Sequence, residues 1–220
     1  VNKANLLQEG ISKNVWVTGN TVIDALFSVI NNDYKFEQDV LNSIDFENKK
    51  VVLLTTHRRE NWGEPMENIF EAVVKLINEN EDVEIIFPVH KNPLIRELAN
   101  KYFSEYKDRV NMIEPLEYVE FTNLMSKVYM IMTDSGGIQE EAPALGKPVM
   151  VLRTETERPE AVSAGTVKLA GINKEEIFEI ANTLINNKEE YDKMAYSRNP
   201  YGNGTSCSQI VELLVENLNK

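Results

Sequence analysis

The sequence is poor in cysteine, histidine and positive charge. Cys207 is the single cysteine among 220 residues, so no internal disulfide can form and a reducing compartment such as the cytoplasm is expected. The 35 acidic residues outnumber the 23 basic ones and give a formal net charge of −12. So acidic a chain is a poor partner for nucleic acid or for an anionic membrane surface, and we expect neither. No apolar run reaches the length of a membrane span.

Apolar runs alternate with amphipathic segments along most of the chain. Six runs rich in Val, Ile, Leu and Met are expected to form buried strands, at residues 51–56, 83–89, 110–113, 128–133, 149–152 and 167–169. Helical periodicity predicts helices at 21–30 (with Thr21 as cap), 65–78, 93–103, 118–125, 174–187, 189–196 and 205–218, and one ending at Leu145. This alternation is typical of a doubly wound parallel sheet. The sequence therefore predicts an α/β, Rossmann-like fold, with another short strand at 15–18.

The segment 128–141 combines a buried strand, a glycine turn and the start of a helix. In the turn, Ser135-Gly136-Gly137, free backbone N–H groups and the positive end of the helix dipole favour an anion, and glycine lets a phosphate approach closely. The segment has neither the Lys-Ser/Thr of a P-loop nor the GxGxxG spacing. A plain tight turn between strand and helix explains the same residues, so both interpretations stay open at this point.

Both histidines follow predicted strands, at the edge where ligands of doubly wound sheets bind. His57 follows the strand at 51–56, and His90 follows the strand at 83–89. Basic residues make this edge locally positive and suited to a diphosphate. They are Arg58, Arg59, Lys91, Arg153 and Arg158. Ordinary ion pairing is an equally good account of these charges, since Glu60, Glu155, Glu157 and Glu160 stand beside the arginines.

Glu141 stands in the first turn of the helix that follows the glycines. The helix dipole favours an acidic residue there whatever the function. Beside a bound phosphate, however, a carboxylate is suited to accept hydrogen bonds from neutral ribose hydroxyls, as an acidic residue does in dinucleotide folds. The residues together indicate a site for a nucleoside diphosphate or a nucleotide sugar.

Several long motifs occur in a fixed order along the chain. They are THRREN at 56–61, PVHKNP at 88–93, PLEY at 115–118, DSGGIQEE at 134–141 and RTETERPE at 153–160, with VTGNTVID at 17–24 and NPYG at 199–202. With these motifs the chain resembles the non-hydrolysing UDP-N-acetylglucosamine 2-epimerases over essentially its whole length. The resemblance implies a GT-B-like enzyme, in which two Rossmann-like domains form the active site in the cleft between them.

The resemblance also implies that this chain is the carboxyl-terminal half of such an enzyme. Residues 1–30 would be the end of the missing amino-terminal domain and the linker, 31–204 the UDP-binding domain, and 205–220 a helix that crosses back. The start at Val1 rather than Met, within a helical pattern, suggests a piece of something longer. The expected partners are this missing amino-terminal domain and, in the full-length enzyme, a second copy in a homodimer.

Roles for individual residues follow from the resemblance. Those implied for substrate binding are Leu116, Phe121, Ser135, Gly136, Gly137, Glu141 and Arg158. The Ser-Gly-Gly turn would bind the diphosphate, Glu141 the ribose hydroxyls, and Leu116 and Phe121 the uracil. Packing in the core explains Phe121 at least as well.

The candidate catalytic residue implied by the resemblance is His57, which would line the nucleotide site beside the departing diphosphate. Arg58 and His90 match residues of a second, allosteric UDP-N-acetylglucosamine site of bacterial members. The other contacts of that second site would belong to the missing half.

The reaction implied by the resemblance interconverts UDP-GlcNAc and UDP-ManNAc. UDP is eliminated across C1–C2 to give a 2-acetamidoglucal, and is then added back on the other face at C2. The family needs no cofactor, and its acid and base carboxylates lie in the amino-terminal domain, so this chain is expected to be inactive alone. A GT-B glycosyltransferase donor domain, a hydrolysing epimerase or a non-catalytic nucleotide-sugar binding module would fit the same residues.

Overall fold

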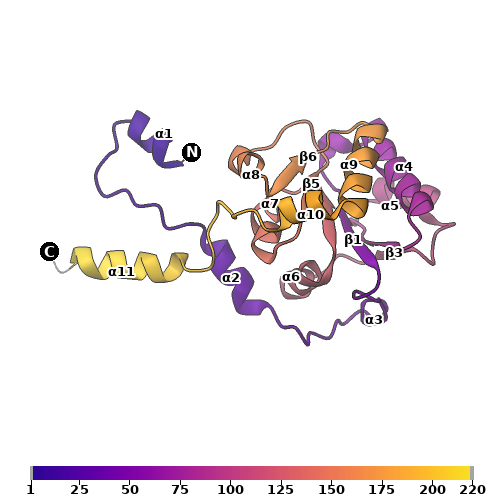
Figure 1. The fold of residues 1–220 in the computed structure, drawn as a ribbon, viewed down its shortest axis with the longest axis horizontal. Helices are drawn as coiled ribbons and strands as arrows, with labels where there is room; N and C mark the ends of the chain where they lie inside the picture. The colour runs from indigo at the N-terminus through magenta and orange to yellow at the C-terminus, as the bar shows by residue number, and fades with distance from the viewer. Residues whose placement is uncertain (1, 219–220) are drawn as a thin grey trace.

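A parallel sheet of six strands forms the centre of the molecule (Figure 1). In this computed structural model, which describes residues 2–218, the strand order is β3-β2-β1-β4-β5-β6. The strands are β1 (Lys50–Thr55), β2 (Val83–Pro88), β3 (Val110–Ile113), β4 (Met130–Thr133), β5 (Val149–Val151) and β6 (Val167–Leu169). All neighbouring strands pair in parallel, so the predicted doubly wound α/β sheet is confirmed. Val1 and 219–220, the outermost parts of the expected segments 1–30 and 205–220, lie outside the described residues.

The direction of strand addition reverses between β1 and β4. From β1 the chain proceeds outward through β2 to β3, and then returns to the other side of β1 and proceeds through β4 to β6. Val52 of β1 accordingly pairs with Ile85 on one side and with Met130 on the other. Ligands of such sheets bind outside the carboxyl ends of the strands at this switch point. A ligand site is therefore expected at the loops that follow β1 and β4.

Helices cover both faces of the sheet, and shorter ones lie in the loops. They are α1 (Asn2–Gln8), α2 (Thr21–Val29), α3 (Asp39–Asn42), η1 (Arg59–Asn61), α4 (Glu64–Glu79), α5 (Pro93–Phe103), α6 (Tyr118–Lys127), α7 (Ile138–Glu141), η2 (Ala142–Leu145), α8 (Pro159–Ala164), α9 (Lys174–Asn186), α10 (Lys188–Ala195) and α11 (Ser206–Leu218). Side chains of α4, α5 and α9 form one core cluster with the sheet, and those of α2 and α6 form a second. Val52 and Leu54 belong to the first cluster, and Val51 and Leu53 to the second, because successive side chains of a strand point to opposite faces.

Three local expectations were wrong. Residues 15–18 form no strand, because β-propensity without a partner strand does not make one, and Trp16 and Val17 are exposed. The cap of α2 is Asn20 rather than Thr21, since the side chain of Asn20 accepts a hydrogen bond from Val22 N at 3.1 Å. The helix after the glycine turn is also interrupted. It is α-helical only to Glu141 and continues as η2, which contains a proline that lacks a backbone N–H.

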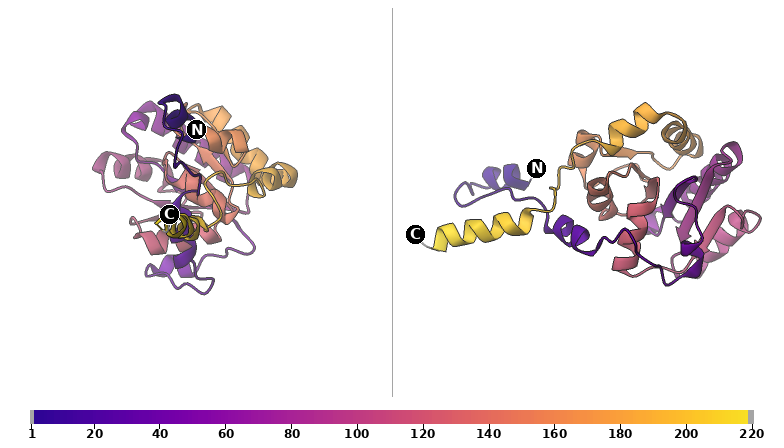
Figure 2. Two further views of the ribbon diagram at one scale, coloured as in Figure 1. Left: turned by 90° about the vertical axis from the view of Figure 1, so that its left-hand side faces the viewer. Right: turned by 60° about the horizontal axis from the view of Figure 1, so that its bottom comes forward.

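Helices α1 and α11 project from the same side of the body (Figures 1 and 2). The start of α11 is anchored on α2, because the carboxylate of Asp24 accepts hydrogen bonds from the backbone N–H groups of Ser206, at 3.2 Å, and Cys207, at 2.9 Å. Beyond this anchor the apolar residues Leu214 and Leu218 of α11 are exposed. Within residues 2–218, no helix combines the length and the apolar character needed to cross a membrane.

Candidate functional site

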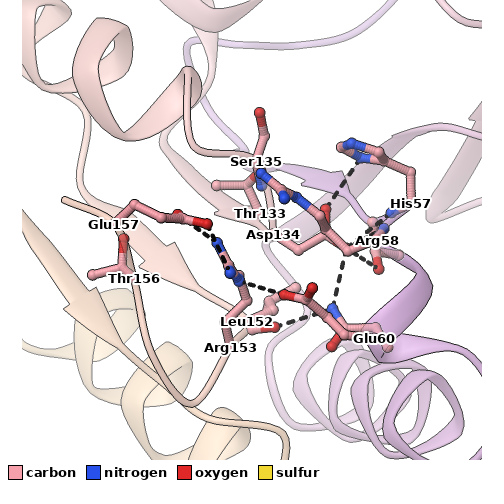
Figure 3. Close-up of polar contacts among 12 residues, drawn as sticks. His57, Arg58, Glu60, Thr133, Asp134, Ser135, Leu152, Arg153, Thr156 and Glu157 are labelled. Carbon is pink, nitrogen blue, oxygen red and sulfur yellow. Dashed lines mark hydrogen bonds and ion pairs between the residues drawn. The ribbon is translucent and has the colours of Figure 1, made fainter.

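The side chain of Asp134, directly after β4, joins the ends of β1 and β4 (Figure 3). Its Oδ2 accepts hydrogen bonds from Thr56 Oγ1 at 3.0 Å, from the backbone N–H groups of His57 and Arg58 at 2.9 Å each, and from Asn61 Nδ2 at 3.1 Å. The carboxyl group is completely buried. One oxygen atom therefore organises the whole loop that follows β1.

His57 meets the other oxygen of the same carboxylate. Its Nδ1 lies 3.1 Å from Asp134 Oδ1, and 44% of the His57 side chain is exposed. The ring stacks on that of His90, with centroids 6.1 Å apart and an angle of 19° between the planes. Burial by itself would raise the pKa of Asp134, but the hydrogen bonds from His57 and from the backbone of Arg58 hold it below its ordinary value. The carboxyl group is therefore ionised at neutral pH.

The glycine turn lies against Arg58. The backbone N–H of Ser135 donates to Thr133 Oγ1 at 3.0 Å, which turns the chain sharply at the end of β4. A Cβ added to Gly136 would lie 3.7 Å from Nη2 of Arg58, so the guanidinium group sits next to the turn. Because α7 has only four residues, its dipole adds little, and the attraction for an anion rests mainly on Arg58 and the backbone of the turn.

A groove of about 200 Å³ adjoins the turn. Its lining includes Thr55, Thr56, His57, Pro88, His90, Pro115, Leu116, Phe121, Ser135 and Ile138. Leu116 and Phe121 are partly buried and also pack against the second core cluster. Five of the expected site residues, drawn from four loops and one helix, thus line one groove with an apolar wall and a polar, histidine-containing wall.

Arg158 lies apart from this groove. It lines a larger cavity of about 800 Å³ together with Glu140, Tyr201 and residues 15–21. Its Nε forms an ion pair with the carboxylate of Glu140, which also accepts a hydrogen bond from Asn20 Nδ2. The structure therefore does not place Arg158 beside Leu116 and Phe121, and its charge is already paired.

Glu141 is half-buried beside Glu140. Burial, and then the charge of Glu140, raise the pKa of Glu141 to about 7. Burial, and then the charge of Glu141, raise the pKa of Tyr118 in α6. Glu141 is thus held in an environment that disfavours its ionised form, which is typical of functional carboxyl groups.

Ion pairing explains part of the basic edge. Arg153 pairs with Glu60, with Nε to Oε1 2.7 Å, and with Glu157, with Nη1 to Oε2 2.8 Å (Figure 3). Hydrogen bonding by Arg153 lowers the pKa of Glu157 to about 2. Arg58 differs, because no ion pair of its guanidinium group is found among the described residues, although its charge also helps to lower the pKa of Glu157. The positive charge available at the turn is therefore that of Arg58, which the sequence had suggested for an allosteric site.

Sequence reasoning missed three residues that hold the site together: Asp134, Asn61 and Glu140. Asp134 and Asn61 stand inside quoted motifs, and a carboxylate directly after a buried strand was a signal that could have singled out Asp134. Asn61 Nδ2 also donates to the carbonyl of Leu152 at 3.1 Å, and so connects the end of β5 to the carboxylate of Asp134. Glu140 was passed over because only its neighbour Glu141 was considered.

The six-stranded parallel sheet with helices on both faces places this chain in the class of Rossmann-like, GT-B-like α/β folds. The family model described as UDP-N-acetylglucosamine 2-epimerase matches residues 1–215. This chain belongs to that family.

Individual relatives agree with the family assignment. The chain is 50% identical over 214 residues to the UDP-N-acetylglucosamine 2-epimerase of Bacillus subtilis, covering 97% of this chain and 55% of the relative. A UDP complex of S. aureus MnaA has a TM-score of 0.90 and 47% identity, covering 99% of this chain and 58% of that one. The Neisseria meningitidis UDP-GlcNAc 2-epimerase, solved with UDP-GlcNAc, has a TM-score of 0.86 and 47% identity, covering 97% and 59%. The chain thus spans little more than half the length of these relatives.

Proposed function

We propose that this chain is the UDP-binding half of a UDP-N-acetylglucosamine 2-epimerase, an isomerase that interconverts UDP-GlcNAc and UDP-ManNAc. The observation that carries the proposal is the meeting of the turn at Ser135, the guanidinium of Arg58 and the groove with Leu116 and Phe121 at the switch point. Family membership supports it, as do the relatives solved with UDP and with UDP-GlcNAc.

The diphosphate would lie over the turn formed by Ser135, Gly136 and Gly137. Gly137 is exposed, and no heavy atom lies within 4 Å of a Cβ built there, so the backbone is open to a phosphate. Arg58 supplies the positive charge, and His57 supplies a ring nitrogen from the facing wall. Charged hydrogen bonds of this kind are worth about 1.5–3 kcal/mol each. The role of Arg58 and His90 at an allosteric site stays a prediction.

Uracil would occupy the apolar part of the groove, against Leu116 and Phe121. A base needs one apolar face for stacking and polar groups at its edge. Glu141, one turn along the chain from the glycines, would accept hydrogen bonds from the ribose hydroxyls. Arg158 lies in the neighbouring cavity, and we propose that it contributes once the nucleotide or another domain displaces its pairing with Glu140.

In the proposed reaction this chain stabilises the departing UDP. Elimination breaks the C1–O bond, removes the proton from C2 and leaves both electrons with the diphosphate, where charge develops. The turn, Arg58 and His57 meet that charge. The base and acid for C2 would come from the amino-terminal domain, and no cofactor is needed because the elimination and re-addition are redox-neutral overall.

The projecting helices would contact that domain. Val211, Leu214, Val215 and Leu218 give α11 an exposed apolar surface, which a partner domain would bury. The division into 1–30, 31–204 and 205–220 stays a prediction, as does a homodimer of the full-length enzyme. Helix α2, within the first segment, packs Ile23 and Leu26 into the core of the body.

Calorimetry with UDP, and NMR of UDP-GlcNAc in deuterated water, test the proposal. We expect the chain to bind UDP more tightly than ADP or uridine, and to catalyse no exchange of the C2 proton alone. Addition of the amino-terminal half of a family member should restore exchange and form UDP-ManNAc. Lack of UDP binding, or C2 exchange by the pure chain alone, would overturn this assignment of roles. Sugar transfer only to an added acceptor would instead indicate a glycosyltransferase.

A further inference from the structure

The two oxygens of the Asp134 carboxylate have unequal surroundings. Oδ2 accepts four hydrogen bonds, from Thr56, Asn61 and the backbone N–H groups of His57 and Arg58. Oδ1 is buried and accepts no well-aligned hydrogen bond among the described residues; the ring nitrogen Nδ1 of His57, 3.1 Å away, is its ion-pair contact. The four donors at Oδ2 demand an acceptor there, so an amide at this position would have to place its oxygen, and not its NH₂ group, at the Oδ2 position.

An ionised carboxylate accepts hydrogen bonds and cannot donate one. The neutral ring of His57 can therefore satisfy Oδ1 only if Nδ1 carries the proton, which leaves a lone pair on Nε2. We propose that Asp134 is a positioning residue that holds neutral His57 as the Nδ1–H tautomer, so that Nε2 presents a lone pair to the ligand groove. The identity of that ligand rests on the proposed function, whereas the tautomer does not.

His90 provides the opposite case in the same groove. Its Nδ1 accepts a hydrogen bond from the backbone N–H of Asn92 at 3.1 Å, so its proton belongs on Nε2. The stacked rings of His57 and His90 are thus held as different tautomers, one with an acceptor and the other with a donor at Nε2. A diphosphate entering the groove would meet a ready donor in His90.

The tautomer decides what His57 can do. A lone pair on Nε2 can take up a proton from solvent or from the ligand, and the resulting imidazolium can donate to a phosphate oxygen. The buried negative charge of Asp134 then compensates the positive ring, as second-shell carboxylates do for other functional histidines. With the other tautomer, the neutral ring would already be a donor at Nε2 and could not act as a base toward the groove.

The test is the tautomer-sensitive nitrogen spectrum of the chain labelled with ¹⁵N-histidine. Only two histidines are present, and His90→Gln assigns their signals. At a pH where both rings are neutral, we expect protonated Nδ1 and unprotonated Nε2 for His57, and the reverse for His90. In Asp134→Asn the amide oxygen should take the Oδ2 position, because four donors point there. The NH₂ group then donates to Nδ1, and the His57 pattern should reverse while that of His90 stays the same.

Thr56→Val is the matched control, because it removes a donor to Oδ2 and leaves Oδ1 untouched, so the His57 pattern should not change. If Asp134→Asn does not fold, the wild-type and Thr56→Val spectra still decide. An Nε2–H pattern for His57 in the wild-type chain would overturn the proposal, as would an unchanged pattern in folded Asp134→Asn. Titration with UDP gives a separate answer. Absence of UDP binding with the expected tautomers would reject the proposed function and leave the role of Asp134 intact.

Discussion

The carboxylate of Glu140 pairs with Nε of Arg158 and, on the same side chain, accepts a hydrogen bond from the amide of Asn20. These partners come from the loop before α8 and from the segment that leads into α2. The amide of Asn199 adds a hydrogen bond, of 3.1 Å, to the backbone carbonyl of Glu140. Glu140 therefore joins the expected nucleotide edge to the segments from which α1 and α11 project.

We expect Glu140→Gln to lower the free energy of unfolding by about 1–3 kcal/mol, because it leaves a partly buried guanidinium without its counter-charge. Urea unfolding followed by circular dichroism measures this change. Asp192→Asn is the control, since it removes an ion pair with Lys188, whose side chain is 82% exposed, and should have little effect. Equal stability of Glu140→Gln and wild type would show that the buried pair contributes nothing net.

Glu141→Gln should weaken UDP binding and stabilise the free chain at neutral pH. The pKa of Glu141 is raised to about 7 from 4.5, so the folded state holds the proton more tightly than the unfolded state. Stability therefore falls as pH rises from about 4.5 to about 7, and the loss is complete above that range. Allowing for solvent screening, the variant should gain about 1–2 kcal/mol at pH 8 and almost nothing at pH 4.

Binding by the same variant is measured by calorimetry with UDP. Loss of charged hydrogen bonds to the ribose should cost about 1.5–3 kcal/mol. Glu216→Gln, an exposed glutamate on α11, serves as the control for both measurements. Unchanged UDP affinity would remove the ribose role from Glu141, and unchanged stability at pH 8 would show that its carboxyl group is well solvated.

Phe121→Ala and Arg58→Ala should separate the two halves of the nucleotide site. Loss of a stacking face should reduce affinity for UDP by about 1–3 kcal/mol and leave affinity for inorganic pyrophosphate unchanged. Arg58→Ala should weaken both ligands by about 1.5–3 kcal/mol, because it removes the charge beside the turn. Arg96→Ala is the control: Arg96 lies on α5 and is ion-paired with Glu114, and its loss should change neither affinity. Weaker pyrophosphate binding by folded Phe121→Ala would contradict the base-stacking role.

Gly19→Ala should loosen the joint between the body and α11. Gly19 has φ +91°, and an added Cβ would lie 2.6 Å from Ser206 Oγ and 2.9 Å from the carbonyl oxygen of Tyr201. We expect a cost of about 1–2 kcal/mol from left-handed strain, and a further cost of about 1–3 kcal/mol from the displaced backbone. Hydrogen exchange of α11 and urea unfolding measure it. Gly10→Ala is the matched control, because Gly10 also has a positive φ, of +81°, but no heavy atom lies within 4 Å of an added Cβ. It should show the cost of left-handed strain without the cost of displaced backbone.

The sequence by itself determined the architecture and the neighbourhood of the site. Short unbroken apolar runs are typical of strands that are buried on both faces of a sheet. Their alternation with helices indicates that the sheet is parallel. The carboxyl ends of such strands share one edge, so His57, His90 and Ser135 could be placed together without coordinates. The motifs around them were specific enough to give the family.

The tertiary structure decided the pairings between side chains. Periodicity says which face of an element a residue occupies, but not which atom of a distant loop comes within 3 Å of it. Whether Arg153 and Arg158 were free or paired was undecided in the sequence, because acids stood beside both. In the structure Arg158 forms an ion pair with Glu140, and Arg153 forms ion pairs with Glu60 and Glu157.

Burial likewise depended on long-range packing. The sequence contains Asp134 and Glu141 as two acids of one motif, with nothing to distinguish their environments. In the fold, Asp134 gains four donors at one oxygen and the ring of His57 beside the other, and keeps its charge, whereas the environment of Glu141, half-buried beside another carboxylate, favours the protonated form. The difference arises because hydrogen-bond donors and neighbouring charges are brought to each carboxyl group by segments far away in the chain.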